Sequence, residues 1–122
     1  MKKLNSIFLI VMLIASVGVI YAGDKTIEGE LVDISCYVRG ASGSSHQACA
    51  IVCAKLGKPV GIAAKDGKIY TLQLASSDVA DYMAKTVKVT GTIHEASQSI
   101  TPLNLEVLND KKWVKIETSK SM

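Results

Sequence analysis

The sequence has few aromatic residues and, beyond its N-terminus, almost no net charge. Aromatic side chains make up 5% of the 122 residues. Two of the 14 basic residues, Lys2 and Lys3, precede the first apolar run. The rest of the chain has 11 acidic residues and therefore a net charge of about +1. No segment interleaves basic with aromatic residues, so nothing suggests an electrostatic or base-stacking surface for nucleic acid. We therefore expect no nucleic-acid partner.

The N-terminus has the layout of a secretory signal. Lys2 and Lys3 form a short positive region, and Ile7 to Ile20 is almost entirely apolar. Ala22 then provides a small residue at a plausible cleavage point, before polar residues begin. We expect residues 1–22 to be a cleaved signal peptide and residues 23–122 to be the mature domain. The mature protein would be exported, either to the periplasm or out of the cell.

An uncleaved membrane anchor is the alternative for this segment. A spanning helix requires roughly 20 apolar residues, and Asn5, Ser6, Ser16 and Gly18 weaken the run. No cysteine follows the run directly, so a lipoprotein anchor has no acceptor there. We therefore expect no stable membrane anchor after cleavage.

Apolar periodicity downstream of the signal predicts short strands and two helices. The clearest alternation places Val87, Val89, Gly91 and Ile93 on one face of a strand. An Asp66–Gly67 turn between apolar runs predicts a tight hairpin. The expected strands cover 26–34, 60–64, 69–74, 87–94, 100–107 and 113–116, and the expected helices cover 46–56 and 76–85.

Three local details accompany these elements. Ser44, followed three residues later by Gln47, resembles a capping box for the first helix. Ser76 or Ser77 is expected to cap the second helix. In the strand over 100–107, simple alternation places Leu103 on the same face as Leu105 and Val107.

The order of elements predicts one mainly β domain of the α+β class. Three strands, a helix and two further strands match the layout of an OB-like barrel of five to six strands. The second helix would lie between strands three and four. The segment 35–57, with its loop and helix, would be an insertion between strands one and two.

All three cysteines of the chain fall within this insertion. On a helix beginning near His46, positions 46, 49 and 53 share one face, and Cys36 at the end of the first strand could meet that face. Thiolate and imidazole ligands suit zinc, and thiolates also suit Cu(I). The pattern therefore predicts a Zn or Cu site formed by Cys36, His46, Cys49 and Cys53, with a structural or metal-handling role and no catalytic residues.

Two other uses of the cysteines remain open. In an exported protein, Cys36 could form a disulfide with Cys49 or Cys53. The bond would close a loop of 13 or 17 residues and stabilise the fold by ~3 kcal/mol. The domain would then be a stapled binding module for a protein or glycan partner in the cell envelope. Alternatively, Cys49 near a helix N-terminus could have a lowered pKa and serve thiol redox chemistry.

Asp33 and His94 are two further polar residues for which the sequence suggests a role. Asp33 precedes the cysteine segment, where it could orient His46 or simply end a strand. His94 lies on the outward face of its strand, and we expect it to be a solvated surface residue.

These residues together resemble a group of small exported bacterial domains of uncharacterised function. The shared features are Gly29-x3-Asp33-x2-Cys36, His46-x2-Cys49-Ala50-x2-Cys53 and Gly57-x-Pro59-Val60-Gly61, followed by the Asp66–Gly67 hairpin and the Val87–Thr92 strand. The resemblance covers most of the mature chain, and the cysteine–histidine cluster is its most specific part. It implies an OB-like fold, bacterial export and a functional cluster, but no known reaction.

Overall fold

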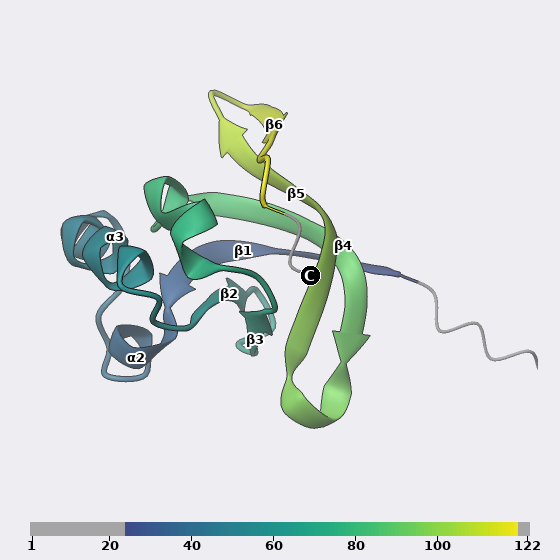
Figure 1. Ribbon diagram of the computed structural model, residues 1–122, viewed down its shortest axis with the longest axis horizontal. Helices are drawn as coiled ribbons and strands as arrows, with labels where there is room; N and C mark the ends of the chain where they lie inside the picture. Colours follow the sequence, from purple (N-terminus) through teal and green to yellow (C-terminus); the bar gives the residue numbers. More distant parts are fainter. Residues whose placement is uncertain (1–23, 120–122) are drawn as a thin grey trace, which may run out of the picture.

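Six strands and a few short helices form the part of the chain that the computed structural model describes, residues 24–119 (Figure 1). The expected signal peptide, residues 1–22, lies outside the described residues. No helix in the described part is long and apolar enough to cross a membrane. The strands are β1 (Lys25–Asp33), β2 (Val60–Ala64), β3 (Ile69–Leu72), β4 (Thr86–His94), β5 (Ser99–Asn109) and β6 (Lys112–Lys115).

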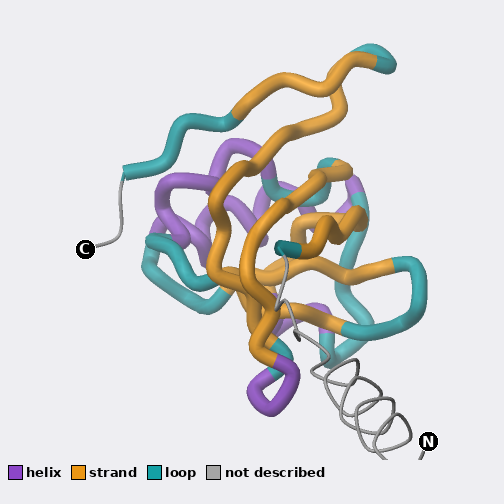
Figure 2. The backbone as a smooth tube through the Cα atoms, turned by 90° about the vertical axis from the view of Figure 1, so that its right-hand side faces the viewer, coloured by secondary structure: helices purple, strands orange, loops and turns teal. Residues whose placement is uncertain are grey.

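Five of these strands close into a mixed barrel. The sheet order is β3-β2-β1-β4-β5-β6. A short parallel pairing of β3 with β5 closes this sheet into the barrel. The other pairings are antiparallel. The strand β6 pairs with β5 alone and extends away from the barrel, as Figures 1 and 2 show.

The long strand β1 changes its pairing partner along its length. Residues 25–30 pair with β4, and residues 29–33 pair with β2. Gly29 belongs to both ladders, and a Cβ atom there would collide with the carbonyl of Ala63. The absence of a side chain at Gly29 therefore lets β1 pass closely against β2 where it changes partners.

The barrel interior contains the main hydrophobic core. Alternation in β4 is as the sequence predicts, since Val87, Val89 and Gly91 are buried and Thr92 and His94 are exposed. The largest fully buried side chains come from most of the barrel strands and from the segment before β4: Leu31, Ile62, Met83, Ile100, Val60, Val79, Val87 and Val89.

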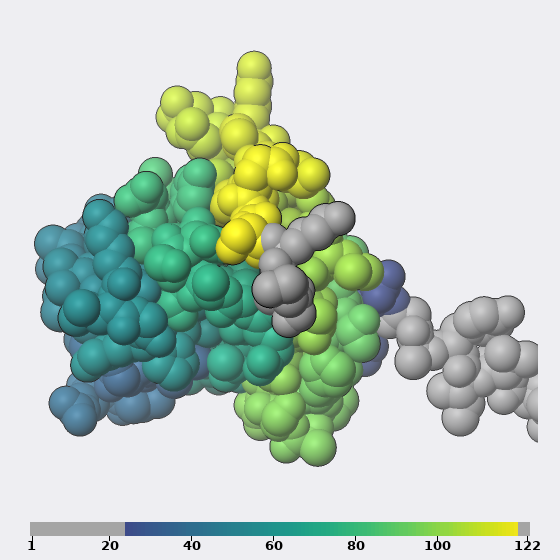
Figure 3. Space-filling view, viewed as in Figure 1, coloured from purple at the N-terminus to yellow at the C-terminus, as the bar shows by residue number. Residues whose placement is uncertain are grey.

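The helical segments gather mainly at one end of the barrel (Figures 1 and 3). The helix α3 (Gln47–Lys55) packs on the 3-10 helix η3 (Ser76–Tyr82), and its Ala50 and Ala54 join the core. The alanines let the helix approach the barrel closely because they carry little side-chain volume. The helical segments are α2 (Ile34–Tyr37), η2 (Ser44–His46), α3 (Gln47–Lys55), η3 (Ser76–Tyr82) and η4 (Glu95–Ser97).

The predicted helix caps are wrong. His46 is the N-cap of α3 and makes no side-chain capping bond. Gln47 instead reaches across to the end of η3, where its Nε2 donates to the carbonyl of Met83 at 2.9 Å. The second helix is a 3-10 helix whose N-cap is Ala75, so neither Ser76 nor Ser77 caps it. In α3, a tertiary hydrogen bond has taken the place of the local one that the spacing predicts.

The predicted inward position of Leu103 is also wrong, and a β-bulge explains why. Thr90 pairs with Asn104, whereas the next residue, Gly91, pairs with Pro102. Leu103 therefore has no partner on β4, and the alternation of β5 changes phase at this point. As a result Leu105 is 3% exposed while Leu103 is 68% exposed.

This phase change predicts unequal effects for two identical substitutions. Leu105→Ala should lower the free energy of unfolding by about 2–5 kcal/mol because it leaves a cavity in the core. Leu103→Ala should change it by less than ~0.5 kcal/mol because the side chain is solvated. Urea denaturation of the two variants measures both values. Equal losses would contradict the bulge.

Candidate metal site

The site begins where β1 ends, at a buried carboxylate. Asp33 is 2% exposed. Its Oδ1 accepts hydrogen bonds from the backbone N of Ser35 at 3.0 Å and from the Ser35 hydroxyl at 2.7 Å. These bonds cap the short helix α2, which the sequence does not predict. Cys36 consequently lies on a helical turn instead of at the end of the strand.

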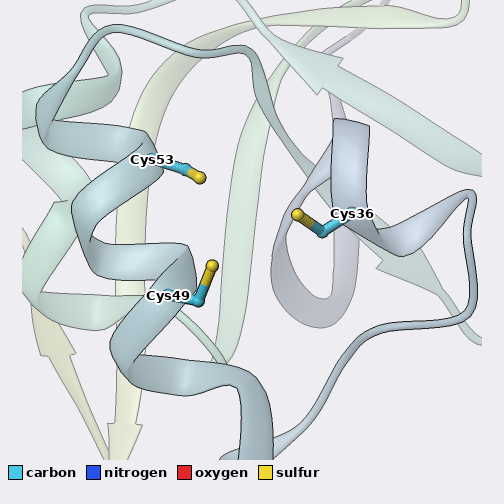
Figure 4. A group of neighbouring side chains, drawn as sticks. All are labelled: Cys36, Cys49 and Cys53. Atoms are coloured by element: carbon cyan, nitrogen blue, oxygen red, sulfur yellow. The ribbon is translucent and has the colours of Figure 1, made fainter.

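The helix α3 supplies the other two cysteines. Cys49 and Cys53 are one helical turn apart, and both side chains face Cys36 across the space between the two helices (Figure 4). The three sulfur atoms lie within 4.8 Å of one another. Cys53 is buried, Cys36 is half-buried and Cys49 is exposed, so the group extends from the protein interior to the surface.

His46 lies in a second group, which overlaps the first. A ring nitrogen of His46, a carboxylate oxygen of Asp33 and the sulfur of Cys36 are within 4.8 Å of one another. The structure thus brings all four sequence-predicted residues into one neighbourhood, but His46 does not join the close group of three sulfurs. Cys36 is the residue that both groups share.

Two of the residues in this second group each have a buried polar atom that lacks a hydrogen-bond partner of ordinary geometry. The two atoms are Oδ2 of Asp33 and Nε2 of His46. Most buried polar atoms in proteins are paired, so unpaired ones point to a ligand or to catalysis. Here one atom is a carboxylate oxygen and the other an imidazole nitrogen, which are both metal ligands.

The carboxylate controls the protonation of the nearby thiols. Burial alone would raise the pKa of Asp33, but hydrogen bonds from Ser35 and weak ones from the thiols of Cys36 and Cys53 outweigh it and lower that pKa. In return, hydrogen bonding to Asp33, together with burial, raises the pKa of Cys36 and raises that of Cys53 to about 11. Both thiols therefore keep their protons at neutral pH unless a cation replaces them.

Asp33 has a larger part in the site than the sequence indicates. The sequence predicts that it orients His46 or ends a strand, and the structure places its carboxylate against two of the cysteines and the histidine. The available signal was the Asp33-x2-Cys36 spacing, which puts both side chains in one turn. His94 is exposed, as expected, and its Nε2 is 2.9 Å from the hydroxyl oxygen of Thr101.

No protein-family model, curated protein or solved structure matches the chain. The resemblance to small exported bacterial domains therefore stays a prediction, and the chemistry of the site depends on its own geometry.

The link between Asp33 and Cys53 predicts a specific pH dependence of the metal-free protein. The folded-state pKa of Cys53 is raised from 9.0 to about 11, so this thiol contributes stability below pH 9 that is lost as the pH rises toward 11. Asp33→Asn removes the negative charge but keeps an oxygen for Ser35. We expect it to lower the pKa of Cys53 toward 9.0, measured by the ultraviolet absorbance of thiolates during titration.

Asp110→Asn is the matched control for this titration. Asp110 is exposed in the turn between β5 and β6, and Asn suits its positive φ of 46°. The control should leave the thiol titration unchanged. If Asp33→Asn also leaves the thiol titration unchanged, hydrogen bonding to Asp33 is not what raises the pKa of Cys53.

Proposed function

We propose that this domain binds a thiophilic transition metal, Zn²⁺ or Cu⁺, through Cys36, His46, Cys49 and Cys53. The observation that carries the proposal is the approach of three sulfur atoms, from two separate helices, to within 4.8 Å. The site would serve either to hold the insertion against the barrel or to handle the metal for the cell envelope. Export rests on the N-terminal sequence alone.

The spacing of the sulfurs is close to what such an ion needs. Zn–S bonds of about 2.3 Å place tetrahedral thiolates ~3.8 Å apart. The observed sulfurs, within 4.8 Å, can reach that spacing through small side-chain rotations. Cys49 and Cys53 already share one helix face, so little chain entropy is lost when both bind the same ion.

A disulfide is the second candidate, because the same proximity suits it. Cys36 could pair with Cys49 or Cys53, leaving one thiol and a stapled binding module for a protein or glycan. A thiol redox function has less support. The raised pKa values of Cys36 and Cys53 disfavour the thiolates that such chemistry uses.

We also propose that the barrel is OB-like. Support comes from the closed cycle β1-β2-β3-β5-β4, from the parallel pairing of β3 with β5, and from the helical segment η3 between β3 and β4. The segment 35–57 would then be the inserted element, and it contains the cysteine cluster.

Metal content and thiol content, measured on one sample, separate the two candidates. The mature domain, residues 23–122, is expressed in an oxidising compartment. Metal binding predicts at least one Zn or Cu per chain and three thiols that become reactive after chelation. A chain without metal and with one reactive thiol would establish the disulfide instead.

Substitution of the two histidines tests the role of His46 in binding. His46→Ala should weaken metal binding by about 10-fold or more because it removes an imidazole ligand. His94→Ala, the matched control on the outer face of β4, should leave affinity unchanged. Competition with a chromophoric chelator measures both. Equal affinities for both variants would remove His46 from the site.

A further inference from the structure

We infer that the cluster holds two metal ions, the second bound by Asp33, Cys36 and His46, with the Cys36 thiolate bridging both. This inference rests on the proposed metal-binding function and divides its four ligands between two ions, so that His46 binds the second ion and not the ion of the three sulfurs. The first ion would bind to Cys36, Cys49 and Cys53. The two groups of ligand atoms overlap at Cys36 alone, which is the geometry of a bridged pair.

The unpaired atoms of Asp33 and His46 are the first support for a second ion. Oδ2 of Asp33 and Nε2 of His46 are both buried and unpaired. Their two residues form a group of possible metal ligands with Cys36. Asp33 is 2% exposed, so bulk solvent does not reach its carboxylate. An ion between these atoms would pair both at once.

A small cavity beside the same two residues is the second support. It has a volume of about 10 Å³, and Asp33 and His46 are among its lining residues, whereas Cys36 is not. The cavity is therefore a place for a water ligand on the side of the ion away from Cys36. That volume accommodates one water molecule. Three protein ligands and one water make a four-coordinate zinc site with an exchangeable position.

Charge balance also favours two divalent ions. With the metals bound, three thiolates and the Asp33 carboxylate would carry four negative charges in one small volume. One Zn²⁺ neutralises half of this charge, and two Zn²⁺ neutralise all of it. Within the described residues Asp33 forms no ion pair that would supply the missing positive charge. The three thiol protons would leave to solvent as the ions bind.

The donor types identify the second ion as a divalent one. A carboxylate, a thiolate and an imidazole together suit Zn²⁺, whereas Cu⁺ prefers sulfur ligands. The second position should therefore take Zn²⁺, or Co²⁺ as its spectroscopic substitute, even if the three-sulfur position also takes Cu⁺.

Native mass spectrometry of the mature protein with added Zn²⁺ tests this arrangement. We expect two Zn²⁺ per chain in the wild type and one in Asp33→Asn or His46→Gln. Asp110→Asn and His94→Gln, which alter the same residue types away from the cluster, should keep two. Asp33→Asn retains an oxygen for the Ser35 cap, and His46 is only half-buried, so neither change threatens the barrel.

The stoichiometry distinguishes failure of this inference from failure of the proposed function. One Zn²⁺ in the wild type would overturn the second position and leave the metal-binding function intact. No Zn²⁺ or Cu⁺ would overturn both. Two Zn²⁺ retained by both Asp33→Asn and His46→Gln would overturn the assignment of these ligands.

Cobalt tests the bridge itself. Two Co²⁺ ions that share the Cys36 thiolate should be magnetically coupled, so the electron paramagnetic resonance signal per cobalt should fall as the second equivalent binds. A signal that simply doubles would show two isolated ions and overturn the bridge.

Discussion

The carboxylate of Asp33 is the point where the barrel and the cysteine cluster meet. Its backbone belongs to β1 and pairs with Val60 of β2, so the barrel fixes its position. Its side chain caps α2 and lies against the thiols of Cys36 and Cys53. A buried charge is costly unless several groups stabilise it, and here the capping and the thiol contacts share that task. The position of Cys36 therefore depends on the register of β1.

The barrel closes without help from the insertion. The pairing of β3 with β5 joins its two sides, and its core side chains come mostly from the strands and η3. The insertion attaches through alanines of α3 and through the hydrogen bond from Gln47 to Met83. The three cysteines lie in α2 and α3 and therefore take no part in the strand pairing.

Much of the fold could be predicted from the sequence because local patterns determine it. Alternation in β4 and the Asp66–Gly67 turn depend on neighbouring residues alone, and both predicted elements are present. The bulge at Leu103 could not be predicted, because it arises from pairing with a distant strand. The predicted capping box of Ser44 and Gln47 is wrong for a similar reason, since Gln47 bonds instead to Met83, which is distant in the sequence.

In the candidate site too, local spacing could be predicted and contacts between distant segments could not. Helical spacing places Cys49 and Cys53 on one face, and the structure brings Cys36 to that face. The sequence could not show that His46 would group with Asp33 and Cys36 and not with all three sulfurs. That difference arises because His46 sits before the first turn of α3 and because α2 turns Cys36 away from the strand direction.

The graded exposure of the three sulfurs has a consequence for kinetics. Cys49 is exposed, Cys36 is half-buried and Cys53 is buried. An incoming ligand from another molecule would meet Cys49 first, so ligand replacement would follow an order from the surface inward. A metal ion held as proposed would then leave its sulfur ligands one at a time, beginning at Cys49.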